Sequence, residues 1–164
     1  MSYSLKDSSV LMNSYLRAMA TDIASRLPFD IVVTSGIRTA REQAIAMKNK
    51  LEAGENLADI YKDDQYALDV TEAYPSLEAM TAVTARYADA GKGSKHTAGQ
   101  GLDLRTWDAS HVQPMINAVN AAGHKPSLEV DHLHVGGIKT YGTEKKSYLI
   151  LAILAAGALW MYKK

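Results

Sequence analysis

Two short segments, residues 94–108 and 129–137, hold the side chains that most constrain how this chain folds. The first reads SKHTAGQGLDLRTWD and carries His96 and Asp103, and the second reads EVDHLHVGG and carries His132 and His134. Two imidazoles and one carboxylate are the ligand set of a catalytic zinc site, in which three protein ligands leave the fourth position for water. A shared ion requires the two segments to converge, so we expect them to lie together in one sheet.

The spacing inside the first segment suits a loop that leads into a strand. His96 and Asp103 are seven residues apart, across a turn that contains Gly99 and Gly101. Glycine lets the backbone turn tightly, so both side chains can approach one ion.

The second segment has the spacing of a strand with two histidines on one face. His132 and His134 are two residues apart, which allows one to bind a metal while the other lies beside it. Asp131 and Glu129 add carboxylates suited to general-base catalysis. In a regular strand both carboxylates would point away from the histidine face, so we expect a bulge or bend there.

The spacing of apolar residues and the positions of capping and turn-forming residues predict an α+β fold. Apolar stripes with capping residues predict five helices, from Asp7 or Ser8 to about Leu27 and over residues 39–53, 57–72, 77–90 and 108–122. Strands are predicted at residues 30–35, 102–105 and 127–135. Helices that precede and interleave so few strands indicate a small, mostly antiparallel sheet that carries the metal site and is flanked by helices.

Charge and composition narrow the class of protein. The 164 residues suffice for one domain with a proper core, and the absence of cysteine excludes disulfides and cysteine-ligated zinc. The first 144 residues hold 14 basic and 18 acidic side chains, a net charge of −4. This balance gives no reason to expect nucleic-acid binding, which usually needs a basic face.

The C-terminus has a different character. Residues 147–162, SYLILAILAAGALWMY, carry no charge and lie between two lysine pairs, with aromatic residues near both ends. This pattern predicts a transmembrane helix, although its length of about 24 Å is short for a bilayer and a buried C-terminal helix is the alternative. We therefore expect a domain over residues 1–140, a linker over 141–146 and a membrane helix over 147–162; the N-terminus lacks the features of a secretory signal.

Three motifs, in this order, resemble the zinc D-Ala-D-Ala carboxypeptidase and L-alanyl-D-glutamate peptidase family, which shares its metal site with lysostaphin-type peptidases and the hedgehog domain. Residues 35–39, SGIRT, are similar to its S-G-[aromatic]-R-[ST] motif. Residues 94–103, SKHTAGQGLD, are similar to S-x-H-x-x-G-x-A-x-D, and residues 131–134, DHLH, to the closing D/E-x-x-H and H-x-H motif.

The resemblance implies a role for each matched residue. Zinc would be held by His96, Asp103 and His134. Asp131 would be the general base, with Glu129 as the alternative, because the three-residue offset from the last zinc ligand favours Asp131. Arg38 would bind a substrate carboxylate or the developing oxyanion, and His132 would line the site and steady the tetrahedral intermediate.

The chain departs from the family pattern at three points. Ile37 stands where an aromatic residue is usual, and Gly101 stands where alanine is usual. The tryptophan often found beside the last zinc ligand is absent, and Leu133 and Val135 flank His134 instead.

The resemblance implies a zinc-dependent peptidase that hydrolyses the stem peptides or cross-links of bacterial peptidoglycan. With the predicted anchor, we expect a lipid membrane and virion components as further partners, and a bacteriophage enzyme of entry or lysis in a virion membrane or host envelope. The alternative is an anchored structural or recognition protein that binds zinc without catalysis.

Overall fold

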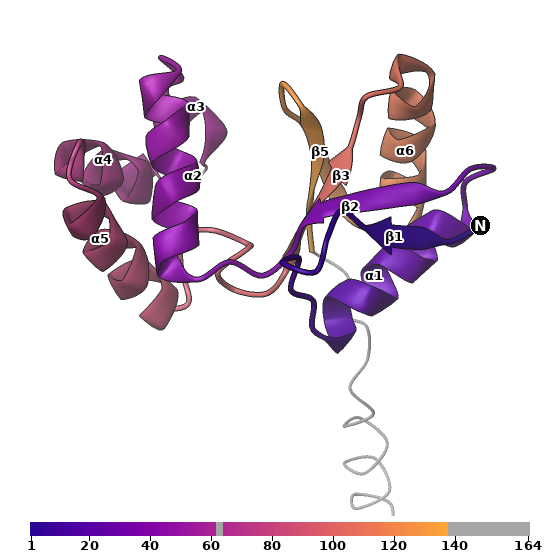
Figure 1. Ribbon diagram of the computed structural model, residues 1–164, viewed down its shortest axis with the longest axis horizontal. Helices are drawn as coiled ribbons and strands as arrows, with labels where there is room; N and C mark the ends of the chain where they lie inside the picture. The colour runs from indigo at the N-terminus through magenta and orange to yellow at the C-terminus, as the bar shows by residue number, and fades with distance from the viewer. Residues whose placement is uncertain (62–63, 138–164) are drawn as a thin grey trace, which may run out of the picture.

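The computed structural model describes residues 1–61 and 64–137, and its centre is a five-stranded mixed sheet (Figure 1). The spatial order is β1-β2-β3-β5-β4. β1 and β2 are parallel, whereas β2–β3, β3–β5 and β5–β4 are antiparallel. The predicted α+β class with a mostly antiparallel sheet is therefore confirmed. The strands span Tyr3–Leu5 (β1), Ile31–Ser35 (β2), Gly101–Arg105 (β3), Lys125–Leu128 (β4) and His132–Gly136 (β5).

Two helices cover one face of the sheet and form what we call the sheet lobe. These are α1 (Ser14–Ser25) and α6 (Ala109–Ala121), whose apolar side chains pack with alternate residues of the central strands. Leu102 and Leu104 of β3 and Leu133 and Val135 of β5 are fully buried in this core. The alternate residues of the same strands, Asp103 and His134 among them, therefore project from the opposite face of the sheet.

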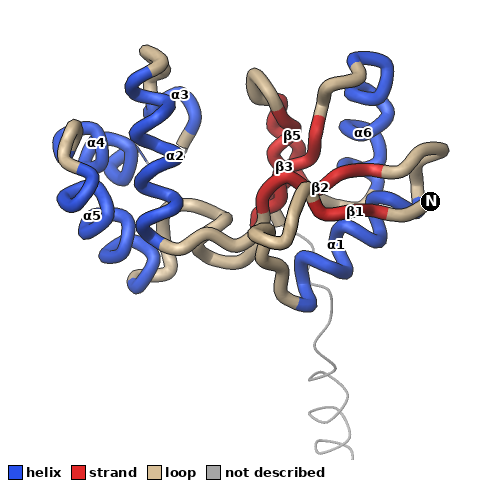
Figure 2. The backbone as a smooth tube through the Cα atoms, viewed as in Figure 1, coloured by secondary structure: helices blue, strands red, loops and turns tan. Residues whose placement is uncertain are grey.

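Four helices between β2 and β3 form a second cluster, the helical lobe. They are α2 (Ala40–Glu52), α3 (Leu57–Ile60), α4 (Asp64–Ala73) and α5 (Leu77–Asp89). Their own core is built around Met47, Tyr66 and Met80, and Figure 2 shows loops joining this lobe to the sheet. Thr39 opens α2 with the predicted capping box: its hydroxyl accepts from Glu42 N, and the Glu42 carboxylate accepts from Thr39 N.

The structure corrects two of the predicted helices and adds one strand. The first helix begins at Ser14, because Asn13 caps it and Asp7 instead accepts from Ser9 N in a turn. Near the N-terminus, Tyr3–Leu5 form β1, a strand that the sequence did not predict. The predicted helix 57–72 is two helices, α3 and α4.

The predicted strand 127–135 is a hairpin. β4 ends at Leu128 and β5 begins at His132, with Glu129 N donating to His132 O across the turn. This turn is the bend expected near Asp131 and Glu129. Because both residues lie outside the strands, the alternation of side chains along a strand does not force them to point away from the histidine face.

The predicted linker (residues 141–146) and membrane helix (residues 147–162) lie outside the described residues. Within residues 1–61 and 64–137, none of the helices combines the length and apolar character needed to cross a bilayer.

Leu133 tests the packing of the sheet lobe. Leu133→Ala should lower the free energy of unfolding by about 2–5 kcal/mol, because it removes a fully buried side chain from between the sheet and its helices. The control is Leu128→Ala on the neighbouring strand, where Leu128 pairs with Leu133 but is 56% exposed, and its effect should stay within about 0.5 kcal/mol. Urea denaturation measures both, and equal losses would contradict this account of the core.

Candidate metal centre

The sheet itself brings two of the predicted ligands together. Asp103 on β3 lies directly opposite His134 on β5, on the face that looks away from the core helices. His134 Nδ1 and Asp103 Oδ1 are 2.9 Å apart. Strand pairing therefore holds an imidazole and a carboxylate in contact without help from a loop.

His96 reaches the same point from the loop that precedes β3. Its Nδ1 lies 2.6 Å from Gly36 O, and because a carbonyl only accepts, Nδ1 is the donor. A neutral ring with its proton on Nδ1 leaves a lone pair on Nε2. That Nε2 lies 3.1 Å from Asp103 Oδ1 and 3.2 Å from His134 Nδ1. Ser94 Oγ accepts from His96 N, which supports the loop locally.

These three atoms fit one metal ion. Ligand atoms about 2.0–2.1 Å from a tetrahedral zinc are separated by about 3.3 Å, close to the spacing seen here. His96, Asp103 and His134 form the group of ligand-type side chains that can hold a metal in the described part of the chain. The ligand set predicted from the sequence is therefore brought together.

Electrostatics favour the protonation states that metal binding needs. Burial lowers the pKa of His96, which keeps its imidazole neutral. Burial raises the pKa of Asp103, but the His134 and His96 imidazoles and the Arg38 guanidinium outweigh it and hold that pKa well below its usual range. Metal ligands must be deprotonated to bind, and a neutral imidazole beside a carboxylate meets that condition.

Arg38 supports the carboxylate ligand. Its Nη2 lies 2.6 Å from Asp103 Oδ2, its Nε donates to Ser35 Oγ at 2.9 Å and its Nη1 faces Gln43 Oε1 at 3.4 Å. Gln43 is fully buried and donates to Tyr61 OH. All three guanidinium nitrogens thus have partners, so Arg38 fixes the orientation of Asp103 from behind the ligand oxygen.

The remaining predicted residues lie together on the β4–β5 turn. His132 Nε2 is 3.4 Å from Asp103 Oδ1, which places its ring at the edge of the ligand cluster. Asp131 is 81% exposed and bonds the far nitrogen, His132 Nδ1, at 2.6 Å. Glu129 is 17% exposed, lies 3.4 Å from His132 Nε2 and forms a 2.8 Å ion pair with Lys50 of the helical lobe.

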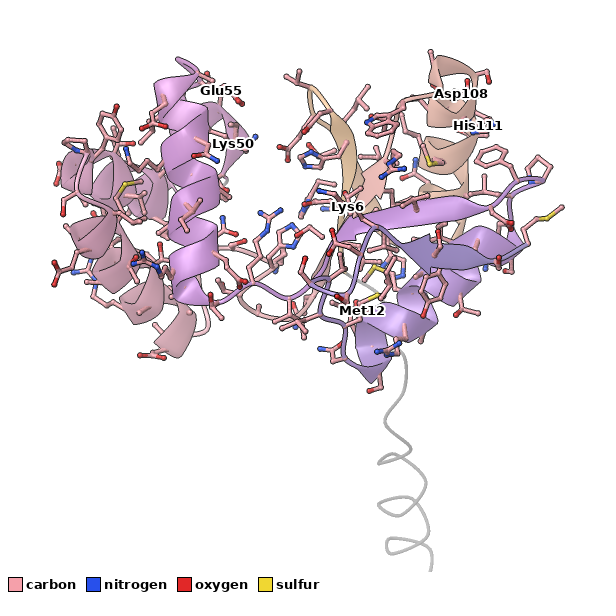
Figure 3. All side chains as sticks on the ribbon, viewed as in Figure 1. Lys6, Met12, Lys50, Glu55, Asp108 and His111 are labelled. Atoms are coloured by element: carbon pink, nitrogen blue, oxygen red, sulfur yellow. The ribbon has the colours of Figure 1, made fainter. Side chains whose placement is uncertain are left out.

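The ligand cluster lies on the wall of a cleft of about 1850 Å³ that both lobes line. Figure 3 shows Lys50 on α2, and Glu55 in the loop that follows α2, on the side toward the sheet. The Lys50–Glu129 ion pair spans this cleft, and the sequence analysis missed it because the partners are 79 residues apart. Gly101, one of the departures from the family pattern, matters here: a Cβ at this position would lie 3.1 Å from His134 Cε1.

Zinc titration of the full-length protein tests the ligand set. Wild type should bind one zinc per chain, and His134→Ala should abolish that binding because it removes one of three ligands. His111→Ala is the matched control, since His111 stacks on Phe29 outside the cluster. Affinity should fall as the solution is made acidic, because protons compete with zinc for its ligands, and the lowered pKa of His96 places its share of that loss below the ordinary histidine range. Zinc bound equally well by His134→Ala would contradict the assignment.

Arg38→Lys tests the support of Asp103. The variant keeps the positive charge but loses the fork that joins Asp103, Ser35 and Gln43, so zinc affinity should fall roughly 10- to 100-fold. Arg17→Lys, at an exposed position on α1, is the control. Calorimetry of both variants measures the effect, and unchanged affinity in Arg38→Lys would show that Asp103 needs no such support.

Comparisons with known proteins assign no family to this site. No family model matches the sequence, and neither the curated proteins nor the solved structures contain a match. What is known of the site therefore comes from its own residues: a buried aspartate, two histidines on converging segments, an arginine behind the carboxylate and a cleft in front of it.

Proposed function

We propose that this protein is a zinc-dependent peptidase that hydrolyses the short peptides of bacterial peptidoglycan. The observation that carries the proposal is the convergence of His96 Nε2, Asp103 Oδ1 and His134 Nδ1 to within 3.2 Å of one another on a cleft wall. Two imidazoles and one carboxylate suit zinc with an open coordination position. The order of the three sequence motifs, which resembles that of the peptidoglycan peptidases, supports the substrate class.

A zinc ion held there would supply Lewis-acid polarisation of the scissile carbonyl and a water of lowered pKa. The chain supplies the rest of the chemistry. Arg38 holds Asp103 in place, and His132 lies beside the ligands, where a ring that carries a proton on Nε2 can donate a hydrogen bond to the oxyanion of the tetrahedral intermediate. A carboxylate of the β4–β5 turn accepts the proton of the attacking water and passes it to the leaving amine.

We assign the proton transfer to Asp131 rather than Glu129. Asp131 is exposed, and its side chain would give up one hydrogen bond, to His132, on turning toward the cleft. Glu129 would have to break its ion pair with Lys50. The three-residue offset from His134 also matches the family motif. Glu129 then serves to hold the helical lobe against the hairpin.

The proposed anchor rests on sequence alone. Residues 147–162 would tether the peptidase domain to a lipid membrane, and such a tether suits a bacteriophage enzyme that opens the cell wall during entry or lysis.

Mass spectrometry of muropeptides tests the function. Full-length protein with zinc should release new amino groups from purified peptidoglycan, and the fragments identify the bond. Asp131→Asn should lower kcat by roughly 10²- to 10⁴-fold through loss of the base while zinc binding persists. Glu129→Gln is the matched control at the neighbouring carboxylate and should retain most of the activity.

Each other outcome has a definite meaning. A larger loss in Glu129→Gln than in Asp131→Asn would move the base to Glu129 and leave the peptidase intact. Zinc binding without digestion of any wall preparation would refute the peptidase and favour an anchored structural or recognition protein.

A further inference from the structure

A glycine strip, formed by Gly101 and Gly136, lies beside the metal ligands on the cleft face of the sheet; Gly101 is buried under Lys95 and the His134 ring, and Gly136 is partly exposed. Gly101 of β3 pairs with Gly136 of β5, and Gly136 pairs with Lys125 of β4. This row is two residues along the strands from the row that holds Asp103 and His134, a distance of about 7 Å. A glycine in a sheet lets another group approach the backbone closely, and at Gly136 nothing lies nearer than 3.9 Å to the position of a Cβ.

Two lysines border this strip. Lys125 shares the strand face of His134 because its neighbour two residues on, Ser127, pairs with His134. Lys95 covers the other border: a Cβ at Gly101 would lie 3.0 Å from Lys95 Cβ, and one at Gly136 would lie 3.9 Å from Lys95 Cγ. Both lysines line the cleft.

Among the described residues, neither ammonium group forms an ion pair, and the same holds for Lys92 elsewhere in the cleft lining, whereas Arg38 and Lys50 are paired. Arg38 pairs with Asp103, and Lys50 pairs with Glu129 and Glu55. The cleft is therefore polarised. The carboxylates of Glu55 and Glu129 are paired with Lys50, and that of Asp131 bonds His132. The ammonium groups of the two lysines beside the glycine strip have no such partner among the described residues.

We propose that Lys95 and Lys125 form a carboxylate-binding subsite over Gly136. This inference rests on the proposed function and names what its substrate must carry: a free carboxylate within about two residues of the scissile amide, since about 7 Å is the span of two extended residues. Arg38 already donates to Asp103, Ser35 and Gln43, whereas neither lysine has an ion-pair partner among the described residues.

Cleavage of a matched peptide pair tests the subsite. The substrates are a synthetic peptidoglycan stem pentapeptide with free carboxylates and the same peptide with every carboxylate converted to a carboxamide. Full-length wild type with zinc should show a kcat/KM at least about tenfold higher for the acid, through KM, which is the scale of one charge-assisted hydrogen bond. In Lys95→Ala/Lys125→Ala this ratio should fall to near one.

Further variants separate charge from folding. Lys95→Arg/Lys125→Arg should restore the preference, and Lys6→Ala, at an exposed lysine outside the cleft lining, should keep the wild-type ratio. Gly136→Glu places a tethered carboxylate between the lysines, where nothing lies closer than 3.9 Å to the added Cβ, and should also lower the ratio.

The outcomes distinguish the two proposals. Cleavage of both peptides at equal rates by wild type, or an acid preference that survives in the double alanine variant, overturns the subsite and leaves the peptidase standing. Cleavage of neither peptide by wild type overturns the peptidase, and the subsite falls with it.

Discussion

Three side-chain atoms of metal-ligand type, His96 Nε2, Asp103 Oδ1 and His134 Nδ1, face one another, and the rest of the site depends on that contact. Gly36 O takes the proton of His96 Nδ1, so the lone pair of His96 Nε2 points toward Asp103 Oδ1 at 3.1 Å. Two acceptors at that distance repel each other unless a proton or a cation lies between them. A divalent ion would satisfy both atoms and His134 Nδ1 at once, so the cluster is one that can hold a metal.

The fold keeps this arrangement rigid by building it into a strand pair. Asp103 and His134 are held by the β3–β5 ladder, whose other face packs Leu102, Leu104 and Leu133 against α1 and α6. A buried carboxylate is costly unless it is paired, and Arg38 supplies the partner on the side away from the ligand oxygen. The same core that stabilises the protein therefore also positions the ligands.

The helical lobe gives the site its second wall. Its core is separate from that of the sheet, and the ion pair between Lys50 and Glu129 links the two lobes across the cleft. The two apolar clusters share no residue in the described part of the chain, so the proposed substrate would enter between the lobes without disrupting either core. The single exposed carboxylate of the hairpin turn, Asp131, then lies at the mouth of the same cleft.

Sequence patterns predicted the ligand cluster, because His96, Asp103 and His134 lie in short segments with characteristic spacing. They also predicted α2, whose capping box is local. They did not reveal β1, which has three residues and depends on pairing with β2, nor the turn that splits residues 127–135. Lys50 and the lysines beside the glycine strip escaped notice because their roles arise from tertiary neighbours, which periodicity does not encode.

X-ray absorption at the zinc edge of the full-length protein tests the central claim most directly. A shell of two imidazole nitrogens and one carboxylate oxygen at about 2.0–2.2 Å, completed by one further oxygen, is the result this account predicts. A six-oxygen shell without imidazole scattering, or a spectrum that is unchanged when His96 and His134 are both replaced by alanine, would contradict it.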